Sequence, residues 1–343
     1  MRGARNGGVP VLGDLLAVSR GRPPVLLVLR ALGLGDFLTA VPAFRGLAEA
    51  FPEHRRLIAA PPALRSLVSL LGGALHGLTA TEQLQPVPCP GPVDVGVNLH
   101  GKGPASHRAL LACAPRRLVA FEHPAVPASR GMPRHQEGEN EVLRWCRLLN
   151  QAGIPSDPTR LGIASPESPV RPDAEGATII HAGAASQARR WPPARWAEVA
   201  RRERREGRVV LLTGSQKERS LATSVARLAG LEDDAVCAGG IDLLGLAALV
   251  SKAGRVVCGD TGVAHLATAL RTPSVILFGP MSPAIWGPPP ERPEHIVLWA
   301  GRSGDPHASR TDRGLLAIGV DDVSAALHRL DRCSPAGGKE RCA

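Results

Sequence analysis

The chain has 343 residues, which is long enough for two domains of ordinary size, each with its own core. Apolar residues make up 44% of it, as in an ordinary globular protein, but aromatic residues only 3%, so the cores must be built from Leu, Val and Ala. The formal net charge of +10 favours anionic partners such as a nucleotide sugar, an anionic lipid or a nucleic acid. No apolar segment reaches the length of a membrane-spanning helix, which excludes that class of protein.

Seven cysteines are scattered along the chain, without a CxxC pair and without the Cys/His spacing of a metal site. Free thiols are expected for all of them: Cys89, Cys113, Cys146, Cys237, Cys258, Cys333 and Cys342. Such thiols are typical of the cytoplasm, which is the predicted location, with contact to the inner face of a membrane left open. Residues 1–22 are basic but contain no continuous apolar stretch, so an ill-defined leader is expected there rather than a signal peptide.

The first half of the chain alternates strands with helices. A continuously apolar strand at 24–29 runs into a Gly-rich turn, and a helix is predicted from 37 to 51. Further strands are expected at 56–60, 74–78, 93–99 and 117–121, and helices at 62–71, 106–114 and 139–152. This alternation predicts a doubly wound α/β domain over residues 23–160.

A proline-rich linker, predicted at 161–176, separates this domain from a second one at 177–318. Strands are expected there at 178–181, 208–213, 256–258 and 274–278, and helices at 193–205, 218–229, 243–252 and 263–270. A last helix is placed within 319–333, and the tail at 334–343 is predicted to be disordered. Two α/β halves of similar size favour a two-lobed enzyme with its ligand between the lobes.

The turn after the first strand carries Asp36 beside two glycines, Gly33 and Gly35, which let the backbone turn tightly. Asp36 is either a general base that takes a proton from an attacking hydroxyl or the N-cap of the following helix, and the sequence alone does not decide. His100 and Lys102 follow another strand end and either line the cleft or decorate a loop, with the loop favoured for Lys102.

Three turns in the second half also follow strands, and each supplies a different polar group. They are Gly183-Ala184-Ala185 with Arg189, Gly214 with Glu218, and Asp260-Thr261-Gly262 with His265. A diphosphate would suit the first and third turns, and ribose hydroxyls would suit Glu218. Taken singly, each has an ordinary structural explanation: a solvated Arg189, a Glu218 that complements the helix dipole, or a Thr261 cap. Together, at the carboxyl ends of parallel strands, they predict a nucleotide site.

Several motifs are missing. The chain has no GxxxxGK[ST] phosphate loop, and Leu38 stands where GxGxxG would have its third glycine. No DxD occurs in a suitable loop, which argues against a metal-held diphosphate; Arg, Lys and helix N-termini must then supply the positive charge. An Arg-rich run at 201–205 is interpreted first as a solvated helix face and only second as a membrane or nucleic-acid patch.

Three stretches resemble glycosyltransferase family 9, the ADP-heptose:lipopolysaccharide heptosyltransferases and their relatives. The strongest is GDTGVAHLATALRTPSVILFGPMSPAIWGP, which is similar to the family's D-T-G-x-x-H-L-A-x-A signature and the segment after it. HAGAASQARRWPPARWAEVA is similar to H-P-G-A-S-x-x-K-R-W-P, and LRALGLGDFLTAVPAFRGL to R-x-x-x-x-G-D-x-L-x-x-x-P. The resemblance covers roughly residues 24–330.

The resemblance implies a GT-B fold, in which two Rossmann-like domains face a cleft and a C-terminal helix usually crosses back to the first. It implies an inverting, metal-independent transfer of a sugar from a nucleotide diphosphate, with no cofactor. By position, Asp36 matches the family's catalytic base, Arg189 replaces a diphosphate-binding Lys, and Glu218 matches the ribose-binding acid. Asp260, Thr261, Gly262 and His265 match the donor site, Ala184 and Ala185 replace hydroxyl-bearing residues that bind phosphate, and Met281 replaces a Thr.

The implied partners are an ADP-heptose-like donor and a glycan, glycolipid or small-molecule acceptor, with no nucleic acid. The sequence identifies neither the sugar nor the acceptor. Two alternatives stay open at this point: a sugar-nucleotide epimerase on the same scaffold, and a non-catalytic nucleotide-binding protein, against which the presence of Asp36 argues.

Overall fold

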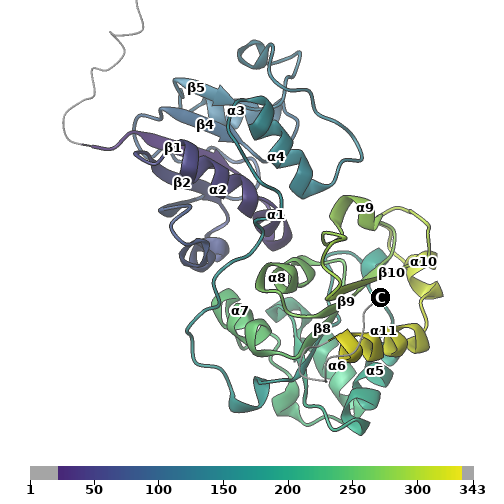
Figure 1. Ribbon diagram of the computed structural model, residues 1–343. Helices are drawn as coiled ribbons and strands as arrows, with labels where there is room; N and C mark the ends of the chain where they lie inside the picture. Colours follow the sequence, from purple (N-terminus) through teal and green to yellow (C-terminus); the bar gives the residue numbers. More distant parts are fainter. Residues whose placement is uncertain (1–21, 334–343) are drawn as a thin grey trace, which may run out of the picture.

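A computed structural model describes residues 22–333, which form two α/β lobes joined by an extended segment (Figure 1). The predicted leader at 1–22 and the predicted disorder at 334–343 therefore lie, apart from residue 22, outside the described residues. Among the described residues, no helix combines the length and the apolar character that crossing a membrane would require.

The first lobe is built on a sheet of five parallel strands in the order β3-β2-β1-β4-β5. They are β1 (Val25–Leu29), β2 (Arg55–Ala60), β3 (Gly77–Ala80), β4 (Val95–Asn98) and β5 (Arg117–Val119). All five residues of β1 are buried, as a continuously apolar central strand requires. The chain reverses its direction of strand addition between β1 and β4, so the loops after these two strands border the switch point at which ligands of such sheets bind.

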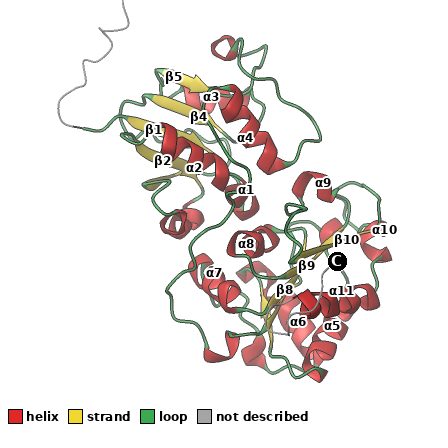
Figure 2. Ribbon diagram, viewed as in Figure 1, coloured by secondary structure: helices red, strands yellow, loops and turns green. Residues whose placement is uncertain are grey.

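The helices of this lobe are α1 (Leu34–Thr39), α2 (Val41–Ala50), α3 (Ala105–Leu111) and α4 (Glu141–Gln151), with a 3₁₀ segment η1 at Pro62–Leu71 and a short one, η2, at Pro127–Ser129 (Figure 2). The single helix predicted at 37–51 is therefore two helices that meet at Ala40. Pro42, which lacks a backbone N–H, stands in the first turn of α2, where no N–H partner is needed.

The second lobe has five parallel strands in the order β10-β9-β8-β6-β7, with its switch point between β6 and β8. They are β6 (Thr178–His181), β7 (Val210–Thr213), β8 (Arg255–Gly259), β9 (Ser274–Phe278) and β10 (His295–Trp299). The helices are α5 (Pro193–Arg205), α6 (Arg219–Ala229), α7 (Leu243–Lys252), α8 (Gly262–Leu270), α9 (Pro283–Trp286), α10 (Arg313–Ala317) and α11 (Val320–Cys333). Short 3₁₀ segments are η3 (Pro172–Ala174), η4 (Gln187–Arg189), η5 (Gln216–Glu218) and η6 (Asp233–Ala235). β10, α9 and α10 were not predicted.

The two lobes touch along a continuous buried surface. Helix α1 of the first lobe packs against α8 of the second, and η1 packs against α7, so one apolar cluster extends across the boundary (Figure 1). The connecting segment is held by both sides, because Ile163 donates its backbone N–H to Ala269 at 3.1 Å and Ala164 to Leu70 at 2.9 Å. The two lobes and the connecting segment therefore share one packed boundary.

The expectation of free thiols is wrong for one pair of cysteines. Cys89 and Cys113 form a disulfide, because the loop after β3 folds back over the end of α3 and brings their Cα atoms within 5.4 Å. The other cysteines whose side chains are described, Cys146, Cys237 and Cys258, are free as expected. For the last helix, α11, the family resemblance left open whether it crosses back to the first lobe. The helix packs on α5, β9 and β10, with Val323 and Leu327 in the core of the second lobe.

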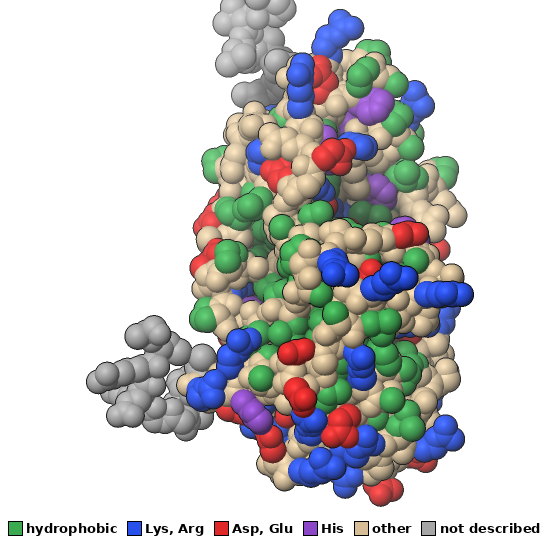
Figure 3. Space-filling model, turned by 90° about the vertical axis from the view of Figure 1, so that its right-hand side faces the viewer, with side chains coloured by type: hydrophobic (Ala, Val, Ile, Leu, Met, Phe, Trp, Pro, Cys, Tyr) green, Lys and Arg blue, Asp and Glu red, His purple; other side chains and the backbone are tan. Residues whose placement is uncertain are grey.

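The Arg-rich run at the end of α5 is ion-paired. Glu198 accepts from Arg201 at 2.7 Å and from Arg202 at 3.2 Å, and Arg202 also pairs with Asp321 of α11 at 2.7 Å. On the face shown in Figure 3, basic and acidic side chains are likewise interspersed over the second lobe. These contacts agree with a solvated, self-neutralised helix face.

His295 at the start of β10 makes the stability of the protein depend on pH. Burial lowers the pKa of this imidazole to about 4, with Glu294 opposing and Arg292 and Arg271 adding to the effect. The unfolded chain binds the proton near pH 6.5, whereas the native protein binds it only near pH 4. The stabilisation is therefore complete above pH 6.5 and is lost as the pH falls toward 4.

Replacing His295 with Gln should remove this part of the pH dependence. In urea denaturation, the wild type should lose about 2 kcal/mol more unfolding free energy than His295→Gln between pH 7 and pH 5. The other buried histidines contribute equally to both proteins and cancel in the comparison. Equal losses in the two proteins would contradict the assignment.

Candidate active site

The polar residues predicted from the sequence follow strands that border the two switch points. Asp36 and His100 lie after β1 and β4, and Arg189 and Asp260 lie after β6 and β8. Since α1 packs against α8, the loops of the two lobes meet at their carboxyl edges. The arrangement brings a carboxylate of one lobe to a helix N-terminus and an arginine of the other.

Asp36 is the third residue of α1, not its N-cap, because the helix begins at Leu34 and Gly33 occupies the cap position. Its carboxylate accepts a hydrogen bond from the backbone N–H of Gly33 at 3.3 Å, and 27% of the side chain remains exposed. The N-cap interpretation was therefore wrong by three positions. Asp36 does complement the start of the helix, yet it keeps an accessible oxygen for a ligand.

The residue that holds Asp36 in place is Arg30, which was not among the predicted site residues. Its guanidinium is only 1% exposed and lies 3.6 Å from Oδ1 of Asp36 and 3.5 Å from Oε2 of Glu141. It also donates to the backbone carbonyls of Asp36 and Leu99 and, at 3.1 Å, to the hydroxyl of Thr39. Arg30 thus ties together α1, the end of β4 and the start of α4.

Glu141, the first residue of α4, shares the charge of Arg30. It is 6% exposed and accepts from the indole N–H of Trp145 at 2.8 Å and from Arg144 one turn later. The Arg30 guanidinium also lies over the ring of Trp145, 4.8 Å from its centroid. Glu141 is thus a second carboxylate partner of Arg30. Because two carboxylates share one positive charge, Arg30 compensates the negative charge of Asp36 only in part.

His100 lies beside this group, whereas Lys102 does not. Nδ1 of His100 accepts from the backbone N–H of Ala31 at 3.1 Å, which leaves the proton on Nε2. Burial lowers the pKa of His100, and the charge of Arg30 lowers it further, so the ring is neutral. Lys102 is exposed and pairs with Glu137 at 2.6 Å, in agreement with the favoured loop interpretation.

In the second lobe, α8 presents its N-terminus to the first. Thr261 occupies the N-cap position without a capping hydrogen bond from its side chain, since its hydroxyl instead points to the carbonyl of Gly259 at 3.4 Å. The first N–H groups of the helix, beginning at Gly262, therefore lack a side-chain partner and can donate hydrogen bonds to an anion. Leu34 of α1 packs on Gly262 from the opposite lobe.

His265, one turn further along α8, packs directly against the loop of Asp36. A Cβ at Gly35 would lie 2.7 Å from its imidazole, so this close approach, and not a positive φ, requires glycine there. On its other side the ring meets Trp286 of α9 edge-on at 5.9 Å. Burial lowers the pKa of His265 although Asp260 and Asp36 oppose it, so the ring is neutral in the site.

Arg189 is held at the same edge by Asp260. Its Nη1 lies 3.3 Å from the carbonyl and 3.5 Å from the carboxylate of Asp260, and its Nε is buried without a partner. Asp260 is 5% exposed, and burial raises its pKa despite the nearby His265 and Arg189. Arg189 is therefore not a solvated loop residue, but 27% of its side chain remains exposed, so its guanidinium can meet a phosphate.

Glu218 folds back onto the turn that precedes it. One carboxylate oxygen accepts from the backbone N–H and the hydroxyl of Ser215, both at 2.8 Å, and the carboxylate lies so close to Gly183 that a Cβ there would collide with it. Burial favours the neutral acid, but the hydrogen bonds from Ser215 and the charge of His181 outweigh it and lower the pKa of Glu218. Glu218 is thus an ionised acceptor beside the Gly183 loop.

The remaining predicted residues differ in exposure. Ala184 is buried and its carbonyl accepts from Arg190 at 2.9 Å, whereas Ala185 is exposed. Gly214 lies between Glu218 and Ala238. Within the described part of the chain, no three His, Cys, Asp or Glu side chains gather as metal ligands would.

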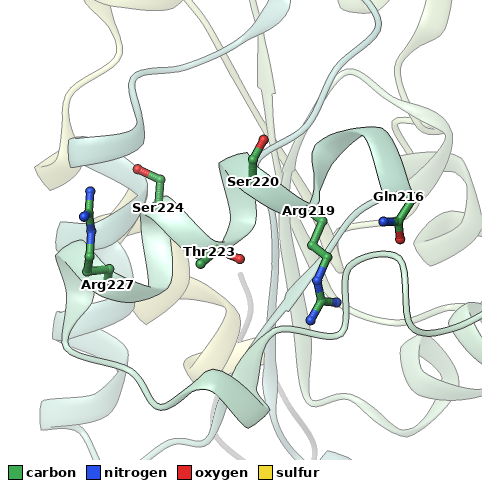
Figure 4. Close-up of a pocket in the computed structure, with 6 residues that line it drawn as sticks. All are labelled: Gln216, Arg219, Ser220, Thr223, Ser224 and Arg227. Atoms are coloured by element: carbon green, nitrogen blue, oxygen red, sulfur yellow. The ribbon is translucent and has the colours of Figure 1, made fainter.

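A cavity of about 580 Å³ lies elsewhere, along α6 (Figure 4). Its lining consists of Gln216, Arg219, Ser220, Thr223, Ser224 and Arg227. None of the predicted site residues lines it; Gln216 belongs to η5, and the other side chains lie along one face of α6.

The ion pair between Arg30 and Glu141 should matter for stability. Glu141→Gln keeps the shape of the side chain but leaves a buried guanidinium with Asp36 as its only carboxylate partner, which should cost about 3 kcal/mol in unfolding free energy. Glu137→Gln, in an exposed pair with Lys102, is the matched control and should change nothing measurable. Equal denaturation midpoints for wild type and Glu141→Gln would contradict the proposed role of this pair.

Comparison with known proteins places this arrangement in a family. Residues 123–315 match the sequence model of glycosyltransferase family 9 (heptosyltransferase). Lipopolysaccharide heptosyltransferase 2 of Salmonella typhimurium is 29% identical over 220 residues, which is 62% of this chain and 61% of that protein. The chain thus spans about three fifths of the length of this curated relative.

Solved structures show the same fold at lower identity. The glycosyl transferase family 9 protein from Veillonella parvula superimposes with a TM-score of 0.72 at 18% identity, over 91% of this chain and 98% of its own. The ADP-heptose lipopolysaccharide heptosyltransferase II of E. coli superimposes with a TM-score of 0.70 at 19% identity, over 89% and 98%. The two facing lobes are those of the GT-B fold. Since the family match covers more than half of the residues, the chain belongs to glycosyltransferase family 9.

Proposed function

We propose that this protein transfers a heptose or a related sugar from a nucleotide diphosphate, of the ADP-heptose type, to an acceptor hydroxyl, with inversion and without a metal ion. The observation that carries the proposal is the position of Asp36. This partly exposed carboxylate is held by a buried arginine at the edge where the first lobe meets the N-terminus of α8. The relatives are named heptosyltransferases, and the name of one of them includes ADP-heptose. These names support the choice of donor.

The donor would lie on the second lobe. Glu218, ionised and next to the Gly183 loop, would accept hydrogen bonds from the ribose hydroxyls. The diphosphate would lie between Arg189 and the N-terminus of α8, where the partly exposed guanidinium of Arg189 and the uncapped N–H groups provide donors. Because Ala184 and Ala185 have no hydroxyl, the loop after β6 can offer the phosphate only backbone N–H groups.

Asp36 would act as the general base from the first lobe. The acceptor hydroxyl transfers its proton to the carboxylate as its oxygen bonds to the anomeric carbon, and the bond from that carbon to the diphosphate breaks. In this proposal the carboxylate and the diphosphate, which belong to opposite lobes, flank the anomeric carbon, so that the hydroxyl would attack the face opposite the leaving group and the configuration would invert. Arg189 and the α8 dipole stabilise the negative charge that grows on the diphosphate.

The acceptor is a glycan, a glycolipid or a small molecule, and the proposed location is the cytoplasm, with peripheral contact to the inner face of the membrane. The role of Arg189 in place of the family's Lys follows from its geometry, because a planar fork can bind Asp260 and a phosphate at once. Nothing in the structure explains the replacement of the usual Thr by Met281.

Asp36→Asn tests the role of the base. Turnover should fall by about 10²–10⁴-fold, the contribution of a single general base, while the affinity for ADP measured by calorimetry stays within about twofold. Asp94→Asn, which alters a carboxylate paired with His54 in the same lobe, should leave turnover unchanged. Undiminished turnover in Asp36→Asn would remove this residue from the mechanism.

Arg189→Ala tests the diphosphate site. Loss of a charged donor should weaken ADP binding about 10- to 100-fold, and Arg189→Lys should restore part of it because the charge returns without the fork. Arg227→Ala, on the exposed face of α6, is the control and should bind ADP as the wild type does. An Arg189→Ala protein with wild-type affinity for ADP would refute the assignment.

A further inference from the structure

An imidazole N–H without a partner lies beside the group that holds Asp36. Because Nδ1 of His100 accepts from the backbone N–H of Ala31 at 3.1 Å, the neutral ring carries its proton on Nε2. Within the described part of the chain, Nε2 meets no hydrogen-bond partner, and the half-buried ring leaves this nitrogen accessible. A ligand can therefore reach one fixed donor here.

In this tautomer, His100 can donate a hydrogen bond but cannot act as a general base. A base needs a free lone pair on a ring nitrogen, and the lone pair of Nδ1 is occupied by the N–H of Ala31. Burial lowers the pKa of His100 and the charge of Arg30 lowers it further, although Asp36 raises it, so the ring is neutral. The role of base is left to Asp36.

A buried chain of hydrogen bonds beneath His100 fixes where it lies. Nε2 of His107 lies 2.6 Å from the carbonyl of Phe121, which can only accept, so its Nδ1 must accept from the amide nitrogen of Asn98 at 2.8 Å. The same nitrogen donates to the hydroxyl of Ser106 at 3.0 Å. The amide oxygen of Asn98 is thereby turned to the backbone N–H of His100, 2.9 Å away. Since Asn98 and His107 are completely buried, this arrangement is rigid.

The backbone next to His100 is tied to the arginine that holds Asp36. The carbonyl of Leu99, the preceding residue, accepts from Arg30, whose guanidinium also lies 3.6 Å from Asp36. On the other side, Ala31 directly follows Arg30 in the chain. The Nε2–H of His100 and the carboxylate of Asp36 are therefore fixed relative to each other at the switch point between β1 and β4 (Figure 1).

We propose that His100 determines acceptor specificity, because its Nε2–H binds a neighbouring oxygen of the acceptor, such as the hydroxyl or ether oxygen on the carbon next to the attacking hydroxyl. The proposal rests on the proposed glycosyl transfer. There, the attacking oxygen gives its proton to Asp36 and uses a lone pair for the new bond, so a neutral donor beside it serves a second oxygen. Acceptors with such an oxygen are preferred over simple alcohols.

The test compares two alcohols of the same length, methoxyethanol and n-butanol, in which an ether oxygen replaces one methylene group. Each is supplied at the same concentration to the full chain with ADP-heptose, and mass spectrometry measures the alkyl heptoside and the free heptose formed with water. The wild type should form the methoxyethyl heptoside at least about tenfold faster than the butyl heptoside.

Two variants separate the proposed contact from support of the loop. His100→Asn keeps an oxygen that can accept from Ala31 but has no donor at the position of Nε2, whereas His100→Gln places an amide N–H there and loses the contact with Ala31. The Asn variant should lower the preference for methoxyethanol about tenfold, with unchanged hydrolysis and ADP affinity, and the Gln variant should keep most of the preference.

His76→Asn is the matched control. Nδ1 of His76 likewise accepts from a backbone N–H, that of Arg56 at 3.0 Å, but it lies where β3 begins, at the opposite edge of the same sheet. This variant should show the preference of the wild type.

Long-range proton–nitrogen NMR correlations of the imidazoles provide a second measurement that needs no substrate. They should show the Nε2–H tautomer for His100, and an Nδ1–H tautomer would overturn the assignment. Equal rates for the two alcohols, a preference that persists in His100→Asn or is lost only in His100→Gln, or hydrolysis without any methoxyethyl heptoside would overturn it as well. A wild type that neither hydrolyses ADP-heptose nor transfers its sugar would instead refute the proposed transfer, on which the role of His100 depends.

Discussion

The buried guanidinium of Arg30 is the contact on which the first lobe's part of the site depends. An arginine that is 1% exposed requires partners, and it finds them in Asp36, Glu141, Thr39 and two backbone carbonyls. These partners belong to α1, α4 and the end of β4, so satisfying one charge fixes three elements at the switch point of the sheet. Asp36 is positioned by this requirement.

The second lobe contributes hydrogen-bond donors that have no side-chain partner in the structure. The uncapped start of α8 and the buried Nε of Arg189 lie at the corresponding switch point, and Asp260 holds the arginine there. His265 joins the two halves, because its ring packs on Gly35 in one direction and on Trp286 in the other. A carboxylate that can accept a proton thus faces a site that can bind an anion, across a boundary made of packed side chains.

The local parts of this site could be predicted from the sequence and the non-local parts could not. Asp260 and Thr261 stand on a turn that follows an apolar strand, Asp36 and His265 lie in the first turns of helices after such strands, and such turns are recognisable from a few neighbouring residues. Glu141 and Arg30 become partners only when α4 crosses the end of β4, which no local pattern reveals. A charged residue at the end of a continuously apolar strand was the one available signal for Arg30.

In the fold, too, local features could be predicted from the sequence and non-local ones could not. The order of strands and helices was largely predicted, while β10, with its partly exposed residues, and the packing of α11 on the second lobe were not. The pairing of Cys89 with Cys113 depends on how one loop folds over α3.

The central claim is inverting, metal-independent transfer, and it can be tested without knowing the acceptor. Water can take the place of the acceptor hydroxyl, so the protein should slowly hydrolyse ADP-heptose in the presence of excess chelator. NMR spectroscopy of the heptose as it is released gives the configuration of the first anomer formed. The account predicts the anomer opposite to that of the donor. Release of the same anomer, or hydrolysis that stops when the chelator is added, would contradict it.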